Sequence, residues 1–80
     1  MQKITFLEDE WTGLVQLVAI PRRRVFVEEH VGREVLRFLI QKGLVEDRDD
    51  LIQATDLGLR VLKANPPVSP LGVRIWYEAA

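Results

Sequence analysis

The sequence contains no cysteine and only one histidine, His30. The lack of cysteine excludes a disulfide framework, a cysteine-ligated zinc site and a thiol nucleophile. With a single histidine, a transition-metal site is not expected either. Positive and negative charges nearly cancel, because eleven Lys and Arg residues stand against twelve Asp and Glu residues. We therefore expect no global field of one sign that would draw a partner to the chain.

Long apolar runs are also missing. Uninterrupted apolar stretches such as residues 17–20 are far shorter than the ~18 residues that a membrane span needs. The first ten residues turn acidic before any apolar segment forms, so we expect no secretory signal and no membrane contact, and we place the chain in the cytoplasm. Its 80 residues fit one domain, residues 1–80, with a proline-rich connection at 65–70. A chain of this size buries only about 60% of its unfolded surface, so a homodimer would add support.

Apolar residues recur at helical spacing in three segments. Trp11 lies on the apolar stripe of the first segment, which Pro21 terminates. A glycine, Gly43, follows the second segment, where the chain can turn left-handed. Thr55 precedes the third segment as a predicted N-cap. The predicted helices are Glu8–Ala19, Gly32–Lys42 and Asp56–Ala64.

Two short segments, Leu44–Glu46 and Leu51–Ala54, are typical of strands and flank a polar cluster at 47–50, so they predict a β-hairpin. Residues 22–29 fit either a strand or a short helix. The alternation in Val73–Tyr77 predicts a terminal strand. That strand either covers the chain's own core, which we favour, or adds its aromatic residues and its edge to a second subunit.

The second predicted helix runs into Gly43-Leu44-Val45, the hairpin follows, and Thr55-Asp56-Leu57-Gly58-Leu59-Arg60-Val61-Leu62 opens the third helix. This order resembles winged-helix domains of the MarR and PadR type, and the resemblance covers Val31 to Ala64, less than half of the chain. In those domains a recognition helix is followed by a hairpin called the wing. The resemblance implies a small α+β domain of winged helix-turn-helix type, with about three helices, a hairpin wing and a C-terminal strand.

The residues themselves offer candidate contacts to double-stranded DNA. Three arginines occur in a row, and a second set recurs every four residues along one side of the second predicted helix. Between residues 21 and 45, six cations stand against three acids. Arg reads guanine or binds phosphate, and Gln reads adenine, so we place the helix 32–42 in a major groove. Arg33, Arg37 and Gln41 are the predicted base contacts, and Arg22, Arg23, Arg24 and Lys42 the predicted phosphate contacts. On this hypothesis the chain is a small transcriptional regulator.

The alternative hypothesis is an adaptor or inhibitor that binds protein and not DNA. The predicted hairpin turn carries four acids and one arginine at 46–50, a net charge of −3, which phosphates would repel. Separate patches of opposite charge favour association with another protein. Fold does not fix function, so the resemblance does not decide between the two hypotheses.

The chain offers little for catalysis. Its glycines are scattered and form no phosphate-binding loop. Ser69 lies between prolines, and His30, expected at a helix entrance, has no nucleophile near it in sequence. We therefore predict neither an enzyme nor a bound cofactor or metal.

Overall fold

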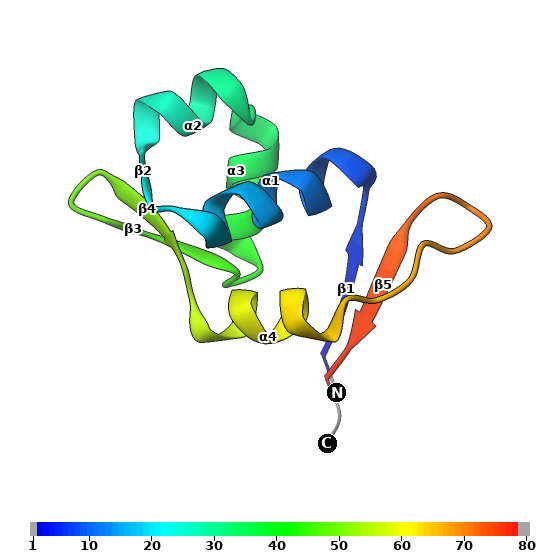
Figure 1. Ribbon diagram of the computed structural model, residues 1–80. Coiled ribbons are helices and arrows are strands. Elements are labelled where there is room, and N and C mark those ends of the chain that lie inside the picture. Colours follow the sequence, from blue (N-terminus) through cyan, green and yellow to red (C-terminus); the bar gives the residue numbers. More distant parts are fainter. Residues whose placement is uncertain (1, 79–80) are drawn as a thin grey trace.

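The computed structural model describes residues 2–78, which form a small α+β domain with four helices and two antiparallel sheets (Figure 1). The helices are α1 (Glu8–Ala19), α2 (Arg24–His30), α3 (Arg33–Gln41) and α4 (Asp56–Ala64). The strands are β1 (Lys3–Phe6), β2 (Arg22–Arg23), β3 (Val45–Arg48), β4 (Leu51–Ala54) and β5 (Arg74–Tyr77).

Three of the helices are those that the sequence predicts, within one residue at each end. Pro21 follows α1, whose C-cap residue Ile20 is already extended. The hydroxyl of Thr55 accepts a hydrogen bond from the backbone N–H of Gly58 and so caps α4. Asn65 ends α4 in the left-handed conformation, at φ 47°.

The segment that the sequence left ambiguous contains both candidate structures. Arg22 and Arg23 form the short strand β2, and α2 begins directly after them. The expected number of about three helices was therefore too low, because α2 adds a fourth. His30 is the last residue of α2 and not, as expected, at a helix entrance.

A three-stranded sheet has the order β2-β4-β3, with both pairings antiparallel (Figure 1). The predicted hairpin is confirmed, but its first strand extends to Arg48, so the turn is only Asp49–Asp50. Both aspartates have positive φ, at 51° and 72°. Pairing of β2 with β4 places the arginines beside this acidic turn.

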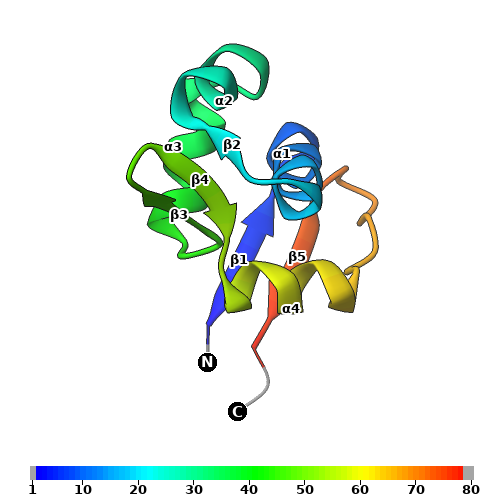
Figure 2. The same ribbon diagram turned by 60° about the vertical axis from the view of Figure 1, so that its left-hand side comes forward.

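A second sheet joins the two ends of the described chain. Strand β1, which the sequence analysis did not find, pairs antiparallel with β5, and the two run side by side in Figures 1 and 2. The inner faces carry Ile4 and Phe6 from β1 and Trp76 from β5, all buried. The terminal strand thus covers the chain's own core, as favoured, and leaves Tyr77 exposed.

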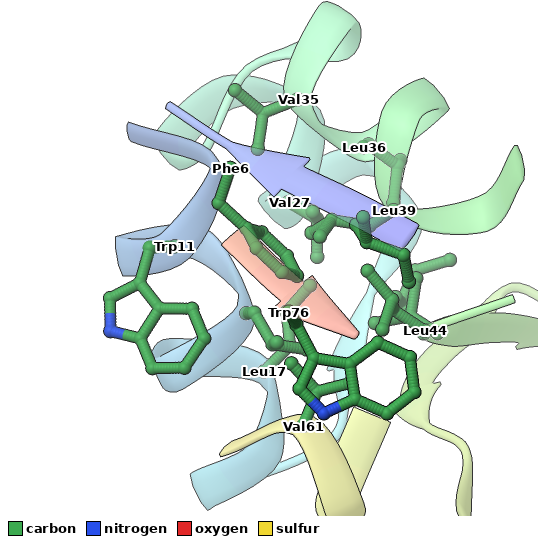
Figure 3. Packing of buried hydrophobic residues seen from close by; sticks show 14 residues of the cluster. Phe6, Trp11, Leu17, Val27, Val35, Leu36, Leu39, Leu44, Val61 and Trp76 are labelled. Carbon is green, nitrogen blue, oxygen red and sulfur yellow. The ribbon is translucent and has the colours of Figure 1, made fainter. Parts of the chain in front are cut away.

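One hydrophobic core lies between the helices and the two sheets. Phe6 points into its middle, beside Trp11 and Trp76 (Figure 3). The ring of Phe6 meets those of Trp11 and Phe38 edge to face, with centroids 5.3 and 5.9 Å apart. Val15 of α1 lies outside this core and is exposed. No helix among residues 2–78 is long and apolar enough to cross a bilayer.

Candidate functional site

Helix α3 presents one apolar and one polar face. Val35, Leu36 and Leu39 are buried against the core. Arg33, Arg37 and Gln41 follow one another at intervals of four residues and are all exposed. Four residues of helix rise about 6 Å, so these three side chains form a stripe about 12 Å long.

Two glycines fix the position of α3. Gly32 precedes the helix at φ 110°, and Gly43 follows it at φ 72°. Residues that carry a side chain rarely adopt these backbone angles. Glycine therefore permits the sharp turns from α2 into α3 and from α3 toward the hairpin. Lys42 is the C-cap residue, exposed next to the polar stripe.

The three consecutive arginines point to three different surroundings. The guanidinium of Arg22 lies over the ring of Phe26, 4.9 Å from its centroid. Arg23 approaches Asp50 of the hairpin at 4.0 Å. Arg24 donates a hydrogen bond of 2.7 Å from Nη1 to Oδ2 of Asp47.

Only Arg24 meets the stripe of α3. It lines a hollow of about 270 Å³ together with the three stripe residues, Glu28 and Ile40. The structure therefore brings together four of the seven predicted contact residues, whereas Arg22 and Arg23 are not among the residues that line the hollow. Lys42 lies one residue beyond it in the chain.

Acidic side chains partly neutralise this surface. Arg24 also approaches Glu28, at 3.6 Å from its Nε, and Arg37 lies 3.7 Å from Glu34. The hydrogen bond to Asp47, followed by the charges of Asp47 and Glu28, raises the pKa of Arg24 above its ordinary value. In the described part of the chain, Arg33 and Lys42 have no ion pair.

The partners of the arginines were not predicted from the sequence. The acidic residues at 46–50 were expected to repel phosphate, and not to pair with Arg23 and Arg24. The sequence did contain one signal for these ion pairs, because residues 22–24 and residues 46–50 carry opposite charges. Using that signal would have required knowing that β2 pairs with β4, which places Arg23 opposite Leu51.

Among residues 2–78 no residue with a polar or charged side chain is buried, and no three His, Asp or Glu side chains gather as metal ligands. The chemistry that the described surface supports is binding of an anion by exposed guanidinium groups. Comparisons of the chain with models of protein families, curated proteins and solved structures give no match.

Proposed function

We propose that this chain is a small DNA-binding regulator of winged-helix type that inserts α3 into a major groove. One observation carries the proposal: the exposed stripe of Arg33, Arg37 and Gln41 borders the same hollow as Arg24. A helix with its side chains is about 10–12 Å across, which fits the width of the groove, about 12 Å. The hollow then faces the edge of the groove, where a phosphate lies.

The order of elements supports the same proposal. After α1, the chain forms in order the two-residue strand β2, the helices α2 and α3, and the hairpin β3–β4. Strand β2 pairs with β4, the second strand of the hairpin. The sequence resemblance implies a recognition helix directly before a wing, and α3 is the helix that directly precedes the hairpin β3–β4. The short helix α2 fills the interval between α1 and the recognition helix.

In this complex, Arg33 and Arg37 donate to guanine and Gln41 pairs with adenine. Lys42 and Arg24 bind phosphates, which position the helix without reading sequence. Arg24 must exchange one partner for another to do so, because its guanidinium is paired with the carboxylate of Asp47 in the free chain. A phosphate replaces the carboxylate, and the hairpin turn moves away from the duplex that would repel it.

The test is a fluorescence anisotropy titration with a pool of random labelled duplexes, at salt concentrations from 20 to about 200 mM. We expect binding that weakens as salt rises, with a log–log slope of about −2 to −3 for two or three phosphate contacts. Arg37→Ala should reduce preference among selected sequences. Arg60→Ala removes an exposed arginine of α4 that pairs with Glu78, and serves as the matched control.

The proposal fails if the chain binds no duplex at the lowest salt, or if Arg33→Ala and Arg37→Ala behave like Arg60→Ala. The second candidate, an adaptor that binds a basic protein surface, is favoured by the acidic tip of the hairpin, where residues 47–50 are exposed. Capture of one defined protein that persists after nuclease treatment, without duplex binding, supports this candidate.

A further inference from the structure

A groove between α1 and α2 lies outside the surface discussed so far. One part, of about 440 Å³, has buried Leu17 and Val27 in its walls and Ile20 and Phe26 at its rim. A second part, of about 400 Å³, continues toward the N-terminal end of α1. The two parts share Gln16, His30 and Val31, so they form one continuous groove.

The two ends of this groove carry opposite charges. Arg22 lines one end, beside the C-terminus of α1. Glu8 and Asp9 line the other end, in the first turn of α1. Within residues 2–78, these three side chains form no ion pair, whereas five other arginines do. Within the described residues, the groove thus leaves one cation and two anions without ion-pair partners.

Apolar side chains are exposed between the charged ends. Ile20 is 53% exposed and Phe26 is 38% exposed, although both adjoin the core residues of the groove. The Phe26 ring is fixed in place, because His30 stacks on it with centroids 4.0 Å apart and Arg22 lies over it. A rigid aromatic side chain at the rim can enter a hollow at little cost in conformational entropy.

We propose that the occupant of the groove is a second copy of this chain, packed about a twofold axis that passes near Gln16. Such an axis makes the two partners use the same surface. It sets Arg22 of each copy against Glu8 and Asp9 of the other, since the charged ends exchange places. It also places Phe26 of each copy over the hollow beside Thr12 and Gly13 of the other, because Phe26 lies at the Arg22 end of the groove.

The charge pattern favours this occupant over a different protein. A groove with one cationic and one acidic end is complementary to itself under a twofold rotation, and the dipoles of the two α1 helices then oppose each other. A specific interface needs about 600 Å² from each partner. The chain exposes 5286 Å² in total, of which this face is one part. The groove shares no lining residue with the hollow at α3, so a dimer leaves both α3 stripes free.

Sedimentation equilibrium from 5 to 500 μM tests the proposal on the whole chain. We expect a monomer–dimer equilibrium. Arg22→Glu should weaken association at least tenfold, and so should the double variant Glu8→Lys with Asp9→Lys. An equimolar mixture of these two variants should form heterodimers, because each charged end then meets its opposite again. Circular dichroism confirms that both variants are folded.

Arg23→Glu is the matched control, since it reverses the neighbouring charge but Arg23 lies beside the hairpin turn. It should leave the dimer unchanged. A wild-type chain that stays monomeric at 500 μM would overturn the proposal. So would association that Arg22→Glu leaves unaltered, or a variant mixture that stays monomeric. None of these results depends on DNA, so they leave the proposed function untouched.

Discussion

Gly58 is the glycine with the least room for a side chain. A Cβ at this position would lie 2.2 Å from the carbonyl oxygen of Leu44, a backbone atom that cannot move aside alone. We expect Gly58→Ala to lower the free energy of unfolding by about 3 kcal/mol, since the backbone would have to shift. Urea unfolding followed by tryptophan fluorescence measures the change.

Leu59→Ala is the control in the same helix, because Leu59 is half exposed and its truncation leaves no cavity. It should change stability by less than about 1 kcal/mol. If Gly58→Ala is no more harmful than this control, α4 is not held against Leu44 as described.

The turn residues Asp49 and Asp50 both have positive φ, a conformation that two-residue hairpins fill best with Asn and Gly. Replacing them together, by Asp49→Asn and Asp50→Gly, should raise the free energy of unfolding by about 1 kcal/mol. The double variant Asp49→Ala with Asp50→Ala removes the same two charges but supplies residues that resist positive φ. It should lower stability, and urea unfolding of the two variants distinguishes the backbone effect from a charge effect.

At the scale of elements, the hairpin and the arginine segment act on each other. Asp47→Asn should raise affinity for duplex DNA several-fold and leave the salt slope nearly unchanged, because Arg24 then binds its phosphate without first giving up the carboxylate of Asp47. Asp49→Asn removes an equal charge from the same hairpin, yet Asp49 has no ion pair among the described residues. Anisotropy titrations of both variants should differ; equal effects would mean that only net charge matters.

Elements with a strong local pattern were predictable from the sequence. The helices α1, α3 and α4 each carry a periodic apolar face and an end signal, and all three lie where expected. Strand β1 alternates exposed and buried residues, a strand pattern that was overlooked, and its pairing with β5 spans about 70 positions of the chain. Strand β2 has two residues and depends on β4. Neither pairing can be predicted from the residues of the strand alone.

The candidate site shows the same limit. Helical spacing correctly grouped Arg33, Arg37 and Gln41 on one exposed side. Spacing could not show where the three consecutive arginines point, because the direction of each side chain depends on a different tertiary neighbour. These neighbours are Phe26 for Arg22, Asp50 for Arg23 and Asp47 for Arg24. Ion pairs between distant segments can be predicted only when the register of the sheet is known. The composition of the chain does not give that register.

For the whole molecule, β5 is the element that closes the core. Trp76 lies opposite Ile4 in the sheet and is only 8% exposed. Losing a buried tryptophan costs about 3–5 kcal/mol, and small domains have about 5–15 kcal/mol in total. A chain that ends at Pro70 should therefore show no cooperative thermal transition. Leu71→Ser, at a residue 89% exposed, is the control and should melt like the wild type.

Pairing of β1 with β5 also determines how the polypeptide can be rewired. The backbone N–H of Glu78 donates a hydrogen bond of 2.8 Å to the carbonyl of Gln2. Both ends emerge together, on the side of the molecule away from α2 (Figures 1 and 2). A bridge of a few residues would convert the chain into a covalent ring, and the ring could be reopened in the loop at 66–72 without interrupting a helix.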